Sequence, residues 1–241
     1  MKKLLLLVLI VPAIGFAQLK DLVKKAQDKV SAISPAGSSG LDIASGLKEA
    51  LNKGVTEQVT KLTAVDGFYK NEAVKILMPP ELQKVDKTLR KMGFGSLADD
   101  GIKSLNRAAE DAVKEATPIF VNAITKMTIT DAKSILMGSD NSATAYLQTN
   151  TSKALYGKFS PIVQQSIGKV GADKVWSSII TKYNSIPLVS KVNPDITDYV
   201  TNKALDGVFK MITVEEKNIR TKLDSRTSDI LKKVFALQDK K

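Results

Sequence analysis

Apolar side chains recur at spacings of three and four residues along almost the whole chain from Gln18 onward, and this periodicity constrains the fold more than any other feature. Each such pattern gives a helix one apolar stripe, which must be buried against another element. No stretch alternates apolar and polar residues for long enough to predict a strand. The sequence therefore predicts an all-α fold, with a single compact multi-helix domain over residues 41–241.

The first 17 residues differ from the rest of the chain and predict a secretory signal peptide. Two lysines follow the initial methionine, residues 4–16 are apolar, and small residues lead up to a cleavage site between Ala17 and Gln18. An uncleaved membrane anchor is the alternative, but a bilayer core needs about 20 apolar residues, and this run also contains Pro12 and Gly15. We therefore expect a periplasmic or secreted protein without a transmembrane segment in the mature chain.

A loosely linked amphipathic helix is expected between the signal peptide and the domain, over residues 18–40. Its apolar side chains follow helical spacing, at Leu19, Leu22, Val23, Ala26, Val30 and Ile33. The stretch SPAGSSG at residues 34–40 then interrupts the pattern, and its content of Gly, Ser and Pro is typical of a flexible link.

Breaks in the apolar pattern divide the domain into predicted helices. The first runs over residues 44–62 and ends near a DG turn, and the next begins at Pro80, since proline suits a first helical turn. An alanine-rich pattern follows over residues 96–127, kinked or split at Pro118. Further helices are predicted over residues 130–137, from about residue 140 with a break near Pro161, and over residues 175–183.

The C-terminal third carries the clearest helix-start signals. Asn193 and Pro194 predict a cap and a first-turn proline for a helix that extends to residue 212. Thr213 and Glu216 have the spacing of a capping box, in which each side chain satisfies a backbone amide near the other, and therefore predict the start of another helix. A last helix is expected over residues 230–237.

The chain contains no histidine and no cysteine, which excludes several classes of site. Nucleophiles activated by histidine, zinc sites built from histidine or thiolate, haem held by an axial histidine and iron–sulfur clusters all need one of these residues. We expect no cofactor and no metal. The formal charge is +11, or +9 once Lys2 and Lys3 leave with the signal peptide, and this balance favours anionic partners.

Four basic side chains lie on one side of the predicted helix after Pro80, at Lys84, Lys87, Arg90 and Lys91. Such a stripe is usually only the solvated face of a helix. The functional alternative is a docking surface for anionic lipid, an acidic glycan or an envelope protein, in which each lysine near a charged membrane contributes about 1 kcal/mol. Nucleic acid is a poorer candidate, because of the predicted export and the lack of a base-stacking motif.

The stretch MGSDNSATAYLQ at residues 137–148 is the other candidate site. In the structural interpretation, Gly138 ends one helix in the left-handed conformation and a serine or Asp140 caps the next. In the functional interpretation, exposed amides at the helix start bind an anionic group, with Asp140, Thr144 and Tyr146 alongside. A calcium loop is excluded, because alanine and threonine stand where it needs glycine and a bidentate glutamate.

Carboxylates and tyrosines are the remaining candidates for catalysis. A glycan-cleaving enzyme needs two carboxyls about 5–10 Å apart, and the acids considered for this role are Asp131, Asp140, Asp198 and Asp206. Those near predicted helix starts have a simpler role, because an acid there stabilises the helix dipole. Arg107 with Glu110 and Asp111 has the spacing of surface ion pairs on one helix, and Trp176 has the helical spacing of a core residue.

Several stretches in a fixed order carry a resemblance to a known family: DGFYKN at 66–71, SLNRAAEDA at 104–112, ITKMTITDA at 124–132, MGSDNSATAYL at 137–147, KYNSIPLV at 182–189, and VTNKALDGVF at 200–209 with EEKNIR after it. On these residues the chain resembles a family of exported bacterial proteins, domain of unknown function 4197, over roughly residues 46–235. The resemblance implies a signal peptide followed by one helical domain, and it carries over no catalytic residue.

The leading hypothesis is a non-enzymatic binding or interaction domain of the bacterial envelope, for an anionic or amphipathic partner. The predicted export, the positive charge and the few types of catalytic side chain favour it. The alternative is a carboxylate- or tyrosine-dependent enzyme that acts on an envelope polymer such as a glycan. An enzyme of that kind needs buried acids that converge in a cleft away from basic partners.

Overall fold

The computed structural model describes residues 40–239, apart from residues 92, 170, 172, 175, 176, 178–180, 182, 183, 186, 189, 190, 192 and 194. The part of the chain from Gly40 onward forms one compact unit. The predicted signal peptide, its cleavage site at Ala17 and Gln18, and the amphipathic helix with its link up to residue 39 lie outside the described residues. Trp176 and most of the predicted helix over residues 175–183 do so as well.

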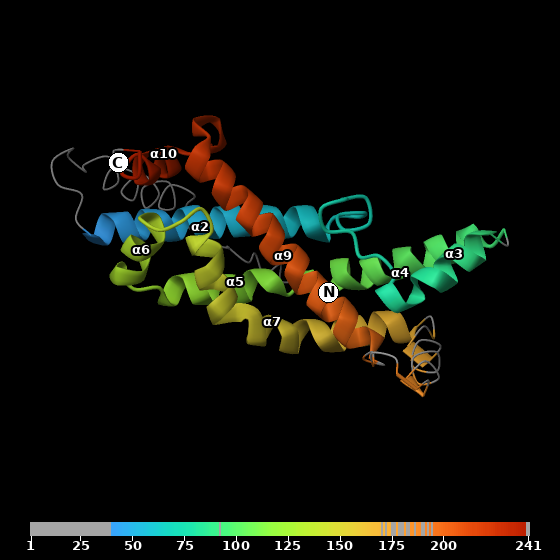
Figure 1. The fold of residues 1–241 in the computed structure, drawn as a ribbon. Coiled ribbons are helices and arrows are strands. Elements are labelled where there is room, and N and C mark those ends of the chain that lie inside the picture. The colour runs from blue at the N-terminus through green and yellow to red at the C-terminus, as the bar shows by residue number, and fades with distance from the viewer. Residues whose placement is uncertain are drawn as a thin grey trace, which may run out of the picture. The chain divides into compact units, whose positions relative to one another are not determined.

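Every regular element in the described part of the chain is helical, which confirms the all-α prediction. In chain order the elements are α2 (Gly40–Thr63), η1 (Pro80–Leu82), α3 (Gln83–Lys91), α4 (Gly95–Val113), α5 (Ala116–Lys126), α6 (Ile129–Leu136), α7 (Ser142–Gly168), α9 (Ile196–Thr221), η2 (Leu223–Ser225) and α10 (Asp229–Phe235) (Figure 1). Within the described residues, no helix is both long enough and apolar enough to cross a bilayer.

The main core lies between α2, α4, α5, α7 and α9. α9 crosses α2 and α7 on the face turned toward the viewer in Figure 1, and it contacts both of them. The alanine face of α4 is fully buried at Ala108, Ala109 and Ala112. Because these side chains are small, α4 can lie close to both α7 and α9. The rings of Phe120 and Phe209 meet edge to face at 5.9 Å between centroids.

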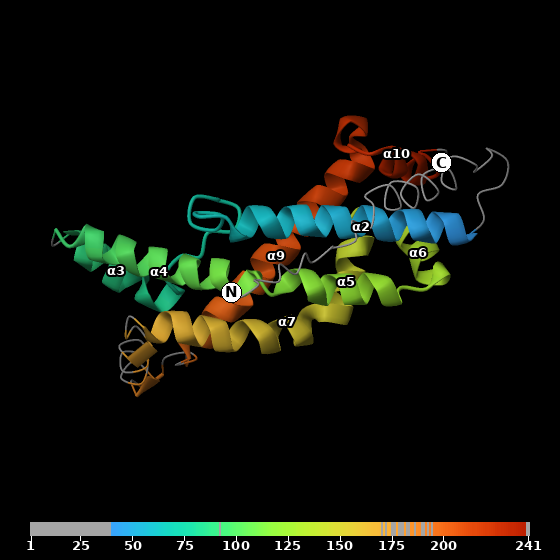
Figure 2. The ribbon, with the colours of Figure 1, turned by 180° about the vertical axis from the view of Figure 1, so that it is seen from behind.

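A second, smaller core joins the N-terminal half of α2 to α6 and α10. Leu47 of α2, Leu136 of α6, and Leu231 and Phe235 of α10 are buried in it. α2 therefore takes part in both cores, which makes residues 40–239 one compact multi-helix domain as predicted. At the opposite end, α3 and α4 form a hairpin that extends past the end of α2, as both ribbon views show (Figures 1 and 2).

Of the two breaks predicted at proline, the one near Pro118 is present and the one near Pro161 is not. The alanine-rich helix is interrupted at residues 114–115, so that Pro118 falls in the first turn of α5, where a missing backbone N–H is no loss. α7 instead runs straight through Pro161. Pro161 and Gly157, whose carbonyl loses its helical partner, are both exposed. Water can therefore satisfy that carbonyl, and the helix continues.

The predicted helix starts in the C-terminal third are also displaced. α9 begins at Ile196, capped by Asp195, whose carboxylate accepts from the amides of Thr197 and Asp198 at 2.8 and 3.3 Å. The cap thus lies two residues beyond Asn193. The capping box at Thr213 is wrong, because α9 continues unbroken to Thr221. The Thr213 hydroxyl donates within the helix, to the Phe209 carbonyl at 2.9 Å.

Candidate functional site

The corner at residues 137–142 joins α6 tightly to α7. Gly138 is favoured there by space, because a Cβ atom would lie 2.8 Å from the backbone carbonyl oxygen of Ser134. The prediction of a left-handed Gly138 is wrong, since its φ angle is not positive. The N-cap residue of α7 is Asn141, and its side chain makes no capping hydrogen bond. No side-chain cap is needed, because the first amides of α7 have another acceptor.

Glu216 of α9 occupies the anion site that the sequence predicted at the start of α7. Its carboxylate accepts hydrogen bonds of 2.8 Å from the amides of Ala143 and Thr144 and from the Thr144 hydroxyl, all of them buried. Asp140 is exposed beside this contact. Tyr146 is half-buried and donates its hydroxyl to a carbonyl of α5 at 3.4 Å, and burial raises the pKa of its phenol.

Arg220 lies one turn further along α9 and connects Glu216 to the end of α6. Its guanidinium donates to the Glu216 carboxylate at 2.8 and 3.0 Å. It also donates to the carbonyls of Ile135 and Leu136 at 2.7 and 3.1 Å. A negative charge therefore faces the start of α7 and a positive charge faces the end of α6, where helix dipoles favour them. We call this arrangement the Glu216–Arg220 joint.

The side chains of α4 hold the non-helical stretch between α2 and η1. The Asn106 amide accepts from the Ile76 backbone N–H and donates to the Ile76 carbonyl, both at 2.8 Å. The Glu110 carboxylate accepts from the amides of Phe68 and Tyr69 at 3.1 and 3.4 Å. These contacts replace the backbone partners that a buried non-helical segment would otherwise lack.

The predicted surface ion pair between Arg107 and Glu110 exists, but Glu110 is only 4% exposed. Arg107 also pairs with Asp66, which takes a left-handed φ of 68° at the turn after α2. The Phe68 ring that follows this turn is fully buried. It lies against Gly207 of α9, where a Cβ atom would come within 2.7 Å of the ring.

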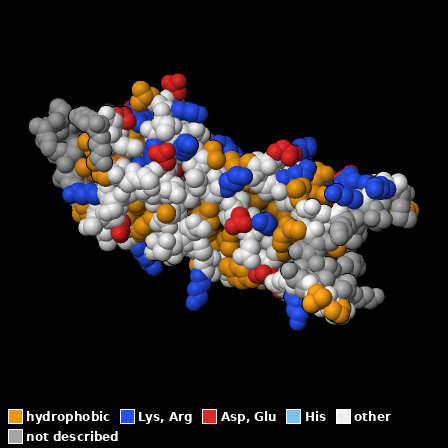
Figure 3. Space-filling view, viewed as in Figure 1, with side chains coloured by type: hydrophobic (Ala, Val, Ile, Leu, Met, Phe, Trp, Pro, Cys, Tyr) orange, Lys and Arg blue, Asp and Glu red, His pale blue; other side chains and the backbone are white. Residues whose placement is uncertain are grey.

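The predicted basic stripe on α3 is divided by its own ion pairs. Lys87 and Lys91 are exposed, whereas the Arg90 guanidinium donates to Asp99 of α4 at 2.6 Å and to an acid one turn earlier in α3 at 3.1 Å. The side chain of Lys84 lies outside the described ones. Blue side chains lie close together over α3 and α4 at the right of Figure 3 and are more widely spaced over most of that face.

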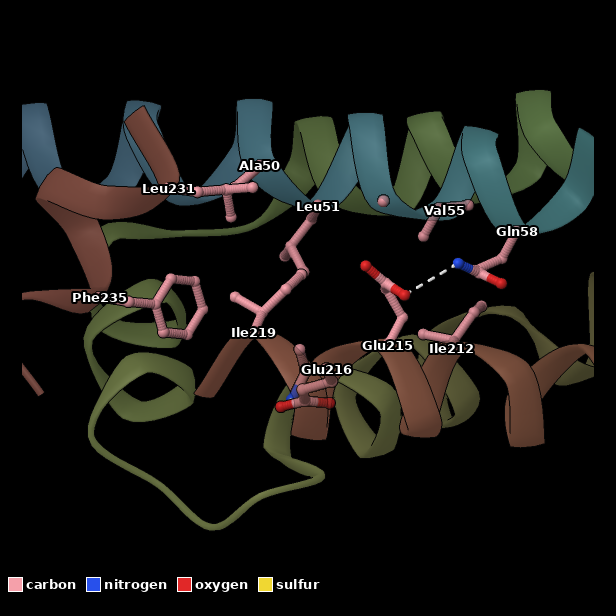
Figure 4. A pocket seen from close by; sticks show the side chains of 12 residues that line it. Ala50, Leu51, Val55, Gln58, Ile212, Glu215, Glu216, Ile219, Leu231 and Phe235 are labelled. Atoms are coloured by element: carbon pink, nitrogen blue, oxygen red, sulfur yellow. Dashed lines mark hydrogen bonds between the residues drawn. The ribbon is translucent and has the colours of Figure 1, made fainter. Parts of the chain in front are cut away.

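An enclosed apolar cavity of about 30 Å³ lies between α2, α9 and α10. Figure 4 shows Leu51, Ile219 and Phe235 around it, with the Glu215 carboxylate bonded to the Gln58 amide at 3.1 Å on one side. A cavity of this size has room for a single water molecule, whereas small-molecule pockets measure about 300–1,000 Å³. This cavity cannot hold an acyl chain.

A tyrosine of α7 is hydrogen-bonded to an acid at the start of α9. Tyr156 donates its hydroxyl to the Asp198 carboxylate at 2.7 Å, and this hydrogen bond raises the pKa of the phenol. Asp198 also accepts from the side-chain amides of Asn193 and Asn202, each at 2.9 Å. Its acceptor capacity is therefore already used within the fold.

The other predicted acids do not converge either. Asp131 belongs to a capping box with Thr128 at the start of α6, and Asp206 lies 3.5 Å from an exposed lysine. Asp173 and Asp195 do line the same open cleft, of about 580 Å³, but Asp195 caps α9. One Asp173 oxygen is buried without a partner among the described residues. Among the described residues, no group of three or more acids is placed to hold a metal ion.

Four of the stretches that carried the family resemblance meet in two pairs at these contacts. DGFYKN meets SLNRAAEDA where α4 holds the turn after α2, and MGSDNSATAYL meets EEKNIR at the Glu216–Arg220 joint. A family model described as a protein of unknown function (DUF4197) matches residues 37–236. The chain belongs to this family. No curated protein and no solved structure matches the chain. The motifs of this DUF4197 domain thus have a structural explanation in the contacts described above.

The Glu216–Arg220 joint was missed in the sequence because Glu216 was assigned to a capping box. A usable signal was present. Glu216 and Arg220 are four residues apart and share a face of α9 with Ile212 and Ile219, both of which are buried. An acid and an arginine on an apolar helix face must have buried partners, since an unpaired charge there is too costly.

Proposed function

We propose that this DUF4197 domain is a non-enzymatic protein that docks on anionic lipid surfaces through the hairpin of α3 and α4, residues 83–113. The observation that carries the proposal is Phe94. It is 53% exposed in the turn between the two helices, three residues after the exposed Lys91. An aromatic ring beside a lysine suits a membrane interface, where the ring enters the headgroup region and the ammonium meets lipid phosphates.

The position of the hairpin supports this role. α3 packs against α4 and η1, and the turn that carries Phe94 lies at the far end of the hairpin from α2 (Figures 1 and 2). α3 carries four basic residues and one acid. The exposed aromatic favours a lipid surface, because its apolar ring leaves water when it enters the headgroup region.

The acids favour binding over the enzyme alternative. The two buried acids among the described residues, Glu110 and Glu216, each face an arginine and accept backbone amides. Both carboxylates are therefore already bonded inside the fold rather than presented to a substrate in a cleft. The small size of the enclosed cavity is consistent with a protein that acts through its surface.

The compartment is part of the same proposal. Residues 1–17 act as a signal peptide, cleavage after Ala17 releases the chain, and the domain meets membranes from the periplasm or from outside the cell. N-terminal sequencing of the protein recovered from that compartment should return Gln18 as the first residue. An intact Met1 in the exported fraction would contradict this part.

Vesicle co-sedimentation tests the docking surface. The chain from Gln18 onward should bind vesicles that contain phosphatidylglycerol, and the binding should weaken as salt is raised. Phe94→Ala should weaken it about five- to thirty-fold, as expected from the loss of about 1–2 kcal/mol of apolar burial. Replacing Lys87 and Lys91 by Gln should weaken it about thirty-fold, from about 1 kcal/mol for each lysine.

Two matched controls isolate the hairpin. Leu223→Ala removes another exposed apolar side chain, 70% exposed, at the far end of α9. The double change of Lys153 and Lys158 to Gln removes two exposed charges from α7. Both controls should bind nearly as well as the unaltered chain. If they weaken binding as much as the hairpin variants do, the attraction is a property of net charge and the proposed docking surface is wrong.

A further inference from the structure

A hollow open to solvent, of about 460 Å³, lies between α4 and the end of α7. It is lined by Asp100, Lys103, Ser104, Arg107, Asp111 and Lys169, among others. Asp100 and Lys103 are six and nine residues along α4 from Phe94, which places them about 9–14 Å from the turn of the hairpin. The hollow is therefore near enough to the proposed docking turn to meet the same headgroup layer.

The charges in the hollow fall into two groups. Arg107 and Asp111 already form ion pairs within the protein. Arg107 pairs with Asp66 and Glu110, and Asp111 pairs with a lysine one turn away. Asp100, Lys103 and Lys169, by contrast, are exposed and form no ion pair with any residue in the described part of the chain. Two cations and one anion thus line a single hollow without an ion-pair partner among the described residues.

The placement of these three charges indicates the chemistry of a ligand. Lys103 of α4 and Lys169, the residue that follows α7, both line the hollow, and a phosphate that enters it can accept from their ammonium groups. Asp100 lies one turn before Lys103 on α4, within reach of a positive group on the same ligand. A purely anionic ligand would leave Asp100 facing a like charge.

We propose that this hollow binds the phosphoethanolamine headgroup of a membrane lipid, with the phosphate between Lys103 and Lys169 and the ammonium at Asp100. This inference rests on the proposed docking through the α3–α4 hairpin and adds headgroup selectivity to it. The hairpin brings the domain to any anionic surface, and the hollow makes it prefer surfaces that also display a primary ammonium next to a phosphate.

The test compares two vesicle types with equal phosphatidylglycerol content. The remaining lipid is phosphatidylethanolamine in one and phosphatidylcholine in the other, whose three methyl groups prevent hydrogen bonds from the ammonium to Asp100. The chain from Gln18 onward should bind the ethanolamine vesicles about five-fold more tightly, which corresponds to roughly one additional charge contact. Asp100→Asn, and the double change of Lys103 and Lys169 to Gln, should each bring the ratio of the two affinities close to one.

The double change of Lys153 and Lys158 to Gln is the matched control and should keep the preference, even if its overall affinity falls. Since both vesicle types are measured with every variant, an effect of lipid packing alone would remain in all variants and would overturn the inference. So would equal binding of the unaltered chain to the two vesicle types. Soluble phosphoethanolamine should compete with the ethanolamine vesicles, and failure to compete when present in large excess would place the preference outside the hollow.

The outcomes separate the two proposals. If the unaltered chain binds neither vesicle type, docking through the hairpin is wrong and the hollow has no membrane role. If it binds both types equally and the hairpin variants still weaken it, docking stands and only the headgroup inference is wrong.

Discussion

Two glycines in helix interiors, Gly54 of α2 and Gly207 of α9, should respond in opposite directions to replacement by alanine. Within a helix, glycine costs about 0.5–1 kcal/mol relative to alanine, because its backbone loses more freedom on folding. At Gly54 an added Cβ atom would have no neighbour within 4 Å, and Gly54 lines the small apolar cavity. Gly54→Ala should therefore raise the free energy of unfolding by about 1 kcal/mol and the Tm by about 2–4 °C.

Gly207 lacks that space. A Cβ atom there would lie 2.7 Å from the Phe68 Cε1 atom and 3.3 Å from the Val74 Cβ atom. Phe68 is fully buried, so its ring cannot move aside without disturbing the core. Overpacking of this kind costs about 1–3 kcal/mol, which exceeds the gain in helix propensity. Gly207→Ala should therefore lower the free energy of unfolding by about 1–2 kcal/mol.

Urea unfolding followed by circular dichroism measures both changes against the unaltered chain. The two variants should differ by about 2–3 kcal/mol with unchanged m values. Gly157→Ala on the exposed side of α7, where an added Cβ atom also has no neighbour within 4 Å, gives the gain in propensity alone. A Gly207→Ala protein as stable as the unaltered chain would refute the close contact between Phe68 and α9.

Three further changes test the polar contacts. Glu216→Gln removes the charge that faces Arg220 and should lower the free energy of unfolding by about 3 kcal/mol or more in urea titration; unchanged stability would contradict the joint. Asn106→Leu leaves the backbone of Ile76 without partners and should cost about 2–4 kcal/mol in the same assay; a neutral result would mean that water reaches that backbone. The pKa of Asp131 lies below its usual 3.8, because the amide and the hydroxyl of the residue that caps α6 bond to its carboxylate. The stabilisation that these hydrogen bonds give the folded state is present above about pH 3.8 and is lost as the pH falls through the lower folded pKa. Asp131→Asn should therefore flatten the acid side of the curve of Tm against pH. An unchanged acid side would count against the capping box.

The fold class was predictable because it depends on a repeated local property, the spacing of apolar residues. The positions of the helix breaks were less predictable, because they depend on single residues and on solvent. Pro161 was predicted to end a helix, but it lies on the exposed side of α7, where water can replace the lost partner. Thr213 was predicted to start a helix, yet its hydroxyl donates to a backbone carbonyl one turn earlier in α9.

The candidate site was less predictable, because its partners are far apart in the sequence. The sequence offered the start of α7 as a seat for an anionic ligand, whereas the amides of Ala143 and Thr144 bond to Glu216, which lies more than 70 residues away. Local rules assign such an acid to its own helix turn. The buried contacts of Asn106 were missed for the same reason, since its partner Ile76 is 30 residues earlier in a stretch without helical periodicity.

The Glu216–Arg220 joint also determines when the protein can finish folding. The helix ends that Glu216 and Arg220 satisfy are made 72 to 85 residues before them. At roughly 5–20 residues per second, translation takes about 4–17 s to cover that distance. During this interval α6 and α7 have been synthesised, but the partners of their facing ends have not. A nascent chain therefore remains loosely assembled, and open to chaperones, until almost its last helix has been synthesised.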